Sequence, residues 1–226
     1  MMKQVIQDSL DSVEYAQKEV LAIGCMLLDK GLVSGTWGNV STRIPDADCI
    51  AVTPSGKPYH ELKFENIVIV DKTGNVIRGD FKPTSELSLH LTIYKARPDI
   101  KAIVHTHSVF ASACAVAHRS IPPIIEDLVQ LAGGSIDVAP YALPGTAELA
   151  LNAVNTLGNK QAVLLANHGV VGCGRSLPEA FIACELVEKA AQIYIHANIL
   201  GGAKTLSPAD VKVMHDLYLN SYQKHP

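Results

Sequence analysis

Apolar residues recur every three or four positions along much of the chain, which is the spacing of one face of an amphipathic helix. The first such stretch runs from Val5 to Lys30, and Gly31 follows it as a helix stop. The same spacing predicts further helices over residues 86–96, 108–118, 122–134, 146–159, 176–200 and 208–222. Ser176 and Glu179 form a capping-box pattern at the start of the longest of these.

Short runs rich in Val and Ile lie between the predicted helices and are typical of strands. We expect strands within residues 49–56, 100–107, 136–142 and 161–169, and a hairpin within residues 66–79. Helices and strands alternate irregularly, and the hairpin comes early. The pattern therefore predicts an α/β fold with a mixed or mostly antiparallel sheet covered by helices. No Gly-x-Gly-x-x-Gly motif follows a strand, which argues against a dinucleotide site.

Composition narrows the class of protein. The chain has 226 residues, of which 48% are hydrophobic and 18% charged, and its formal net charge is −3. These values are typical of a globular protein with a sizeable core, and we expect one domain over residues 1–226. Lys and Arg are scattered, so a nucleic-acid partner is not expected.

Cysteine usage and the apolar runs bear on the compartment. The five cysteines are widely spaced and include no Cys-x-x-Cys pair, which argues against a disulfide framework and a thiolate zinc site. The N-terminal residues include acids where a signal peptide needs an apolar core, and no apolar run reaches membrane-spanning length. We therefore expect a cytoplasmic protein with no membrane partner.

Histidines end two of the apolar strands. In "VHTHS", His105 and His107 are one residue apart, so in a strand their imidazoles project from the same face. His168 ends the later apolar run "LLANHG". Three imidazoles are the ligand set of an open zinc site, which keeps a position for substrate. The alternative is that these side chains only form hydrogen bonds with backbone groups.

Three short loops share a chemistry suited to anions: "GTWGNVS" (35–41), "TPSG" (53–56) and "PTSE" (83–86). Each offers backbone N–H groups at a glycine or a helix start, beside Ser, Thr or Asn side chains. A plain turn is the alternative for any one of them. If all three converge on the histidines, they indicate a phosphorylated ligand.

Glu86 is the carboxylate with a candidate catalytic role. It lies in the first turn of a predicted helix, where an acid is also favoured by the helix dipole alone. Beside a metal-bound carbonyl compound, it would instead act as a general base on the neighbouring carbon. His90 follows four residues later and is interpreted as an ordinary helix residue, on a solvent face or at the edge of the core.

The motifs "GTWGNVS", "TPSG", "PTSE", "VHTHS", "APYALPGT" and "ANHG", taken in this order, resemble the class II aldolase and adducin family. The similarity is to the group of L-fuculose-1-phosphate aldolase and L-ribulose-5-phosphate 4-epimerase, and it extends from the first helix to the last. It implies a single three-layer α/β/α domain with a mixed, mostly antiparallel sheet. It also implies a C4 homotetramer with active sites between subunits.

The resemblance also implies the roles of particular residues. One zinc ion per subunit would be held by His105, His107 and His168, and Glu86 would be the catalytic acid/base and a possible fourth ligand without substrate. The implied phosphate-binding residues lie in the three loops: Gly38, Asn39, Ser55, Gly56, Thr84 and Ser85.

The implied reaction is the reversible retro-aldol cleavage of a deoxyketose 1-phosphate, such as L-fuculose 1-phosphate, to dihydroxyacetone phosphate and an aldehyde. Zinc polarises the carbonyl group, and Glu86 exchanges a proton with the adjacent carbon. A Schiff-base route would need a desolvated lysine, and only Lys101 begins an apolar strand. A pentulose-5-phosphate 4-epimerase, a decarboxylase or a dehydratase is the alternative within the same fold. A non-catalytic adducin-like scaffold is disfavoured because all three histidines and Glu86 are present.

One segment departs from the family pattern. Where the fuculose phosphate aldolase has a helix with a proton-donating tyrosine, this chain has "PPIIEDLVQLAGG", without tyrosine. Glu126 or Asp127 would be the donor there, or both are exposed helix acids. Tyr141 matches a family position and is otherwise a packing residue. Tyr218 and Tyr222 either reach a neighbouring site or are ordinary helix residues.

Overall fold

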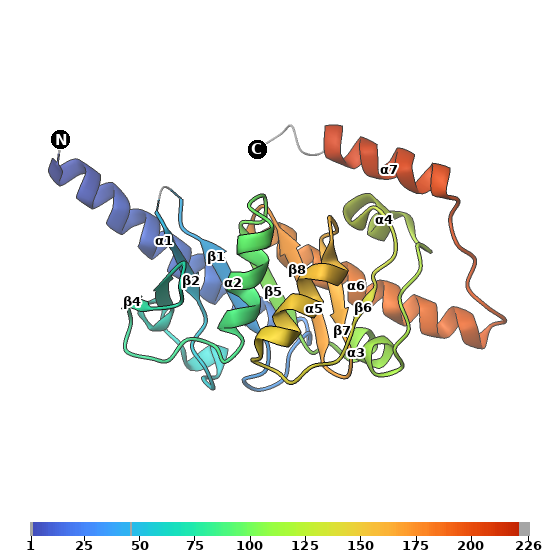
Figure 1. Cartoon of the computed structure of the whole chain (residues 1–226), viewed down its shortest axis with the longest axis horizontal. Coiled ribbons are helices and arrows are strands. Elements are labelled where there is room, and N and C mark those ends of the chain that lie inside the picture. The colour runs from blue at the N-terminus through green and yellow to red at the C-terminus, as the bar shows by residue number, and fades with distance from the viewer. Residues whose placement is uncertain (1, 46, 222–226) are drawn as a thin grey trace.

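The computed structural model describes residues 2–45 and 47–221, with the side chains of residues 11–45 and 47–220. At its centre lies one eight-stranded sheet with the order β4-β3-β2-β1-β5-β8-β7-β6 (Figure 1). In the described part of the chain, β6 and β7 pair in parallel and every other neighbouring pair is antiparallel. The strands are β1 (Asn39–Arg43), β2 (Cys49–Val52), β3 (Val68–Asp71), β4 (Val76–Arg78), β5 (Ala102–Thr106), β6 (Val138–Ala139), β7 (Ala162–Leu165) and β8 (Gly169–Gly174).

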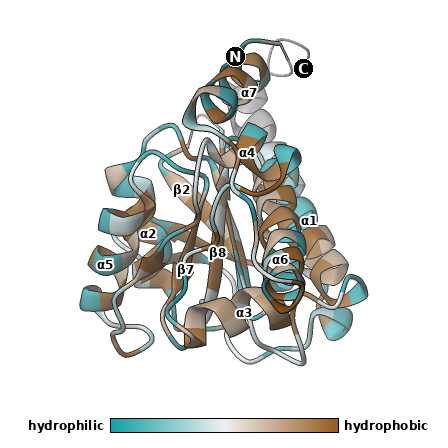
Figure 2. Ribbon diagram, turned by 90° about the vertical axis from the view of Figure 1, so that its right-hand side faces the viewer, coloured by the Kyte–Doolittle hydropathy of each residue, from teal (hydrophilic) through white to brown (hydrophobic). Residues whose placement is uncertain are grey.

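Helices cover both faces of the sheet. Figure 2 shows α2 and α5 on one side and α1 and α6 on the other. A cluster of buried apolar residues joins α3, α4 and α6 to β7 and β8. Helix α7 packs against α4. The helices are α1 (Met2–Asp29), α2 (Leu87–Ala96), α3 (Val109–Val116), α4 (Glu126–Ala132), α5 (Ala147–Leu157), α6 (Leu177–Ile199) and α7 (Pro208–Ser221). The predicted α/β fold with a mostly antiparallel sheet is confirmed, and it has the three layers that the resemblance implied.

Alternation along the strands divides the core. In β5, Ile103 packs in the cluster beneath α2 and α5, whereas Val104 packs in the cluster beneath α1 and α6. Because strand side chains alternate between faces, His105 continues the row of Ile103 on the α2 side. β5 lies between β1 and β8 in the middle of the sheet, so His105 is fully buried.

Every predicted helix is present, but two strands were missed. β1 was interpreted as part of a loop, and β8 contains three glycines, which weaken the strand pattern. Gly172 in β8 is required by the packing of α6, because a Cβ there would lie 2.6 Å from both Ala180 O and Cys184 Sγ.

Within the predicted strand 136–142, only β6 (Val138–Ala139) pairs with the sheet. Residue 222, at the predicted end of the last helix, lies outside the described residues.

In the part of the chain that the structure describes, no helix is long and apolar enough to cross a membrane. The cysteines all lie in this part and are unpaired, as the sequence predicted. The extent of the single domain, residues 1–226, stays a prediction.

Candidate metal centre

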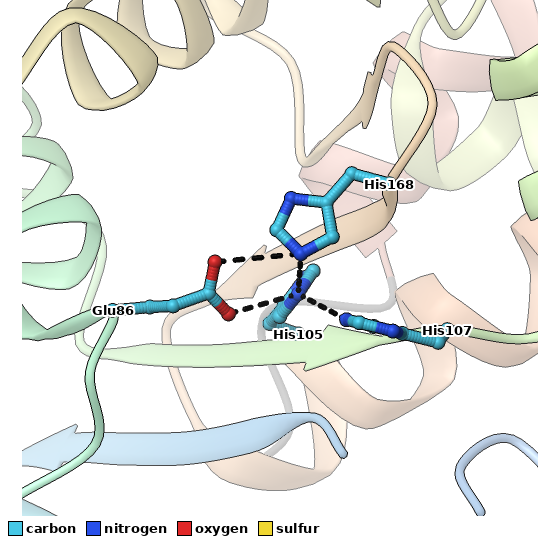
Figure 3. Close-up of side chains that lie close together, drawn as sticks. All are labelled: Glu86, His105, His107 and His168. Carbon is cyan, nitrogen blue, oxygen red and sulfur yellow. Dashed lines mark hydrogen bonds and ion pairs between the residues drawn. The ribbon is translucent and has the colours of Figure 1, made fainter. Parts of the chain in front are cut away.

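Glu86, His105, His107 and His168 converge at one end of the sheet, as the sequence predicted for the three histidines (Figure 3). His105 is in β5, and His107 follows the end of that strand. His168 lies in the turn between β7 and β8, and Glu86 immediately precedes α2. Their ligand atoms all lie within 4.8 Å of one another.

The Nε2 atom of His105 is close to each of the other three side chains. It lies 2.9 Å from Nε2 of His107 and 3.3 Å from Nε2 of His168. Oε2 of Glu86 lies 3.1 Å from the same nitrogen, and Oε1 lies 3.4 Å from Nε2 of His168. Two ligands of a tetrahedral zinc ion with bonds of 2.0–2.1 Å are separated by about 3.3 Å, so this spacing suits a small divalent cation.

Hydrogen bonding and burial also fit a cation. The Nδ1–H group of His105 donates to the carbonyl of Val170 at 2.9 Å, which leaves the Nε2 lone pair directed at the centre. Oε1 of Glu86 is buried and has no hydrogen-bond partner among the described residues. Converging lone pairs and an unpartnered carboxylate oxygen are unfavourable without a positive charge between them.

The protonation states favour ligation as well. Burial, with the neighbouring histidines, lowers the pKa of His107 to about 3 and that of His168 to about 4, so both imidazoles are neutral near pH 7. Burial tends to raise the pKa of Glu86, but the charges of His105 and His168 and the hydrogen bonds from His105 and Asn39 outweigh it and hold that pKa well below its ordinary value. Burial tends to lower the pKa of His105, but the Glu86 carboxylate outweighs it and raises that pKa above its ordinary value. The centre therefore presents two neutral imidazoles, an ionised carboxylate and a third imidazole whose proton a metal ion would replace.

The three predicted anion-binding loops meet beside this centre. An antiparallel bridge between Pro54 and Pro83 joins two of them, with the Ser55 N–H donating to Lys82 O at 2.9 Å and the Thr84 N–H donating to Thr53 O at 3.0 Å. One pocket of about 180 Å³ is lined by all three loops together with Glu86, His107 and His168. The lining residues from the loops are Thr36, Trp37, Gly38, Asn39, Pro54, Ser55, Gly56, Thr84 and Ser85.

Gly38 allows the first loop to approach the sheet. Its φ is +85°, and a Cβ there would lie 2.7 Å from the carbonyl oxygen of His105 and 2.6 Å from Cγ1 of Val33. A larger residue would therefore displace either the loop or the strand that carries His105. The glycine is needed for this close packing as well as for access to its own N–H.

Asn39 differs from the other loop residues because its side chain is buried. Its Nδ2 donates to Oε2 of Glu86 at 2.9 Å, and its Oδ1 faces Nε2 of His90 at 2.5 Å. One hydrogen on Nδ2 is left for a ligand. Sequence reasoning treated His90 as an ordinary helix residue, but it is fully buried and belongs to this polar group. Its spacing of four residues from Glu86 was the available signal.

Trp37 stands at the mouth of the pocket. Its indole is 65% exposed, and its ring centroid lies 5.8 Å from that of His107 at an interplanar angle of 30°. The indole therefore forms one wall of the pocket beside the imidazole of a candidate metal ligand. Sequence reasoning quoted the loop that carries Trp37 but gave this residue no role.

The residues considered as proton donors lie apart from the pocket in this single chain. Asp127 forms an ion pair with Lys189 on α6, and Glu126 is exposed. The Tyr218 hydroxyl donates to Glu179 at 3.5 Å, and Tyr141 is exposed. In the described part of the chain, none of these four candidates lines the pocket. Tyr222 lies outside the described residues.

A family model, curated proteins and solved structures that are similar to this chain all point to the same protein family. The family described as Class II Aldolase and Adducin N-terminal domain matches residues 18–195. A 5-deoxy-D-ribulose 1-phosphate aldolase from Bacillus thuringiensis is 39% identical over 190 residues, covering 84% of this chain and 89% of its own. An L-fuculose phosphate aldolase from Escherichia coli is 40% identical over 165 residues, covering 73% of this chain and 75% of its own. The solved structure of an L-fuculose 1-phosphate aldolase superposes with a TM-score of 0.87 and 36% identity, over 90% of this chain and 96% of its own.

Proposed function

The chain belongs to the class II aldolase and adducin family, and we propose that it is a zinc-dependent aldolase that reversibly cleaves a deoxyketose 1-phosphate to dihydroxyacetone phosphate and an aldehyde. Membership of its aldolase branch makes the protein a metal-dependent aldehyde-lyase acting on a sugar phosphate. L-fuculose 1-phosphate and 5-deoxy-D-ribulose 1-phosphate are the substrates named for its relatives. The metal, the substrate and the residue roles below are our proposals.

His105, His107 and His168 would hold the zinc ion. Their Nε2 atoms point at a common centre, and the His105 hydrogen bond to Val170 fixes the tautomer that ligation needs. The chemistry supplied by a divalent cation held there would be polarisation of the substrate carbonyl group, which would make the proton on the adjacent carbon more acidic.

Glu86 is the proposed general base in the direction of aldol formation. Its ionised carboxylate takes a proton from the carbon next to the carbonyl group of dihydroxyacetone phosphate, and that carbon then attacks the aldehyde. In cleavage, the carbon–carbon bond breaks and Glu86 returns a proton to the same carbon. Asn39 holds Oε2 of Glu86, so the unpartnered Oε1 is the oxygen suited to carry this proton.

The phosphate group is proposed to bind between the three loops. Ser55, Gly56 and Ser85 are exposed at the pocket, and Thr84 anchors the helix start by accepting from the Glu86 N–H at 3.3 Å. Backbone N–H groups and hydroxyls supply donors for the phosphate without a cluster of cations. The phosphate would thereby fix the ketose with its carbonyl end toward Glu86 and the histidines.

The observation that carries the proposal is the single pocket formed by the three loops, Glu86 and two of the three histidines. A coupled assay with glycerol-phosphate dehydrogenase tests it, because that enzyme reports released dihydroxyacetone phosphate. We expect release from at least one deoxyketose 1-phosphate in a panel that includes L-fuculose, L-rhamnulose and 5-deoxyribulose 1-phosphates. Interconversion of L-ribulose 5-phosphate and D-xylulose 5-phosphate, with no release from any member of the panel, would support the epimerase instead.

We also propose a homotetramer in the cytoplasm. Unpaired cysteines suit a reducing compartment, and the exposed Trp37 and Val109 near the site are suited to contact with another subunit. A proton donor for the aldehyde oxygen would then come from a neighbouring chain, since Glu126, Asp127, Tyr141 and Tyr218 do not line the pocket of their own. Light scattering of the purified protein measures the assembly.

A further inference from the structure

Beneath the metal centre, a row of polar side chains from β1 meets a row from α2. Asn39 and Ser41 are two positions apart in β1. Glu86, at the N-terminal cap of α2, is followed at intervals of four residues by His90 and Tyr94 in the helix. Two residues along a strand span about 6.6 Å and four residues along a helix about 6 Å, so successive residues of the two rows lie opposite each other. Apart from the carboxylate, nothing in the metal site explains why this part of the core is polar.

The five side chains form one continuous chain of contacts. Nδ2 of Asn39 lies 2.9 Å from Oε2 of Glu86, and Oδ1 of Asn39 lies 2.5 Å from Nε2 of His90. Nδ1 of His90 lies 2.6 Å from Oγ of Ser41, which lies 2.8 Å from the Tyr94 hydroxyl. Each of these residues is at most 6% exposed, so the chain runs through the protein interior.

The carboxylate of Glu86 determines the direction of every hydrogen bond in this chain. An ionised carboxylate only accepts, so Asn39 must turn its NH₂ group toward Glu86 and its oxygen toward His90. His90 must then donate from Nε2, which leaves Nδ1 as an acceptor for the Ser41 hydroxyl. Tyr94 can donate in turn to Ser41. All donors therefore point toward Glu86.

We propose that His90 is a positioning residue, which fixes the side-chain amide of Asn39 so that it holds Oε2 of Glu86 and leaves Oε1 free to exchange a proton with substrate. The inference rests on the proposed function of Glu86. It assigns a role to a histidine that is outside the pocket and outside the set of metal ligands. His90 acts through Asn39 and does not touch the substrate.

Burial makes the arrangement stable in one orientation only. Burial lowers the pKa of His90 to about 3, so its imidazole is neutral and exists as one of two tautomers. The other tautomer would place two acceptors face to face at Oδ1 of Asn39, and a flipped amide would place oxygen against the Glu86 carboxylate. Either error leaves buried polar atoms unpaired, which is costly at residues that are at most 6% exposed.

Two substitutions of similar size separate positioning from packing. In His90→Gln the longer side chain can place an amide nitrogen near the position of Nε2 and still donate to Asn39. In His90→Asn the shorter side chain can accept from Ser41 but leaves Oδ1 of Asn39 without a donor. Both variants remove the ring, so both lose similar packing.

The measurement is the exchange of the carbon-bound proton of dihydroxyacetone phosphate with deuterium from the solvent, followed by NMR in zinc-loaded protein. It reports the Glu86 step without carbon–carbon bond formation. We expect the exchange rate constant of His90→Gln to stay within about fivefold of the wild type. That of His90→Asn should fall at least about 30-fold, with zinc content and the apparent KM little changed.

Equal losses in the two variants, or no loss in His90→Asn, would overturn the positioning role. Wild-type protein that binds zinc but exchanges no proton would instead overturn the proposed function itself. The ¹⁵N spectrum of the histidines gives a readout independent of activity, with the His90 signals assigned by their loss in His90→Gln. A protonated Nε2 and an unprotonated Nδ1 support the inference, and the opposite tautomer overturns it.

Discussion

The side-chain amide of Asn39 donates to Oε2 of Glu86 at 2.9 Å, which links the first anion-binding loop to the proposed catalytic carboxylate. The register of the sheet produces this contact, because Asn39 in β1 pairs with His105 in β5. Glu86 is therefore held from the side of β1, while its other oxygen lies toward His168. The first loop, Glu86 and the histidines are therefore joined by direct contacts.

Glu86→Gln should lower the rate of cleavage while zinc stays bound. Glutamine keeps the shape of the side chain but cannot accept a proton, and loss of a general base commonly costs 10²–10⁴-fold in rate, so kcat should fall by about 10³-fold. Metal analysis of the same preparation should still find zinc, since the three histidines remain. Normal turnover in this variant would remove Glu86 from the mechanism.

Asn39→Ala and Ser55→Ala should affect different kinetic constants. Asn39 is buried against Glu86, so its loss should lower kcat by about 10- to 100-fold, the value of a hydrogen bond to a charged group. Ser55 is exposed at the pocket, so its loss should mainly raise KM for the phosphorylated substrate. Ser34→Ala is the matched control, since Ser34 is exposed in the loop before Trp37 and does not line the pocket. If Asn39→Ala and Ser55→Ala changed kcat by the same factor and KM by the same factor, the result would contradict this division of roles.

The sequence allowed the three histidines to be predicted as candidate metal ligands because their signal is local. His105 and His107 share a strand face, and His168 ends a second apolar run, so spacing identified three candidate imidazoles, and the family resemblance implied that they bind one metal ion. The three loops were also recognisable from their composition. Their convergence was not, because it depends on the bridge between Pro54 and Pro83, which joins residues far apart in the sequence.

The polar rows were missed for a physical reason. In β1, the residues that face α2 are Asn39, Ser41 and Arg43, so this strand lacks the apolar alternation that identifies strands. His90 and Tyr94 are ambiguous on a helix until the facing strand is known. A comparison of the two spacings, two in β1 and four in α2, would have suggested the pairing.

Trp37 should report metal binding by its fluorescence. It is the single tryptophan of the sequence, and its indole lies beside the His107 ring. Adding Zn²⁺ to metal-free protein should change the emission, with saturation near one ion per chain, and Co²⁺ should quench it. The change should be much weaker in His107→Ala. Emission that is unaffected by metal would show that Trp37 and His107 are not neighbours in solution.

Acid should destabilise the metal-free protein partly through His90. Burial lowers the pKa of His90 to about 3 from 6.5, so below pH 6.5 the unfolded chain binds a proton that the native chain does not. The contribution of the neutral His90 imidazole to the free energy of unfolding is therefore complete above pH 6.5, and it is lost as the pH falls toward 3. Between about pH 6.5 and pH 5, the loss from this residue should be about 2 kcal/mol.

The contribution of His90 can be measured by urea unfolding of the metal-free wild type and the metal-free His90→Gln variant at several pH values in this range. The free energy of unfolding should fall more steeply with decreasing pH in the wild type, because the variant has no imidazole to protonate at this position. His107 and His168 remain in both proteins, so their effect cancels in the comparison. Parallel curves would indicate that His90 is not held neutral by burial.

The most direct test of the central claim is a zinc titration of metal-free protein in the presence of a deoxyketose 1-phosphate, with dihydroxyacetone phosphate measured as it is released. The account predicts that release is absent without metal, rises in proportion to added zinc and reaches its maximum near one ion per chain. The same titration of Glu86→Gln should show full zinc binding with little release. Release that is independent of metal, or zinc binding without release from any deoxyketose 1-phosphate, would contradict the account.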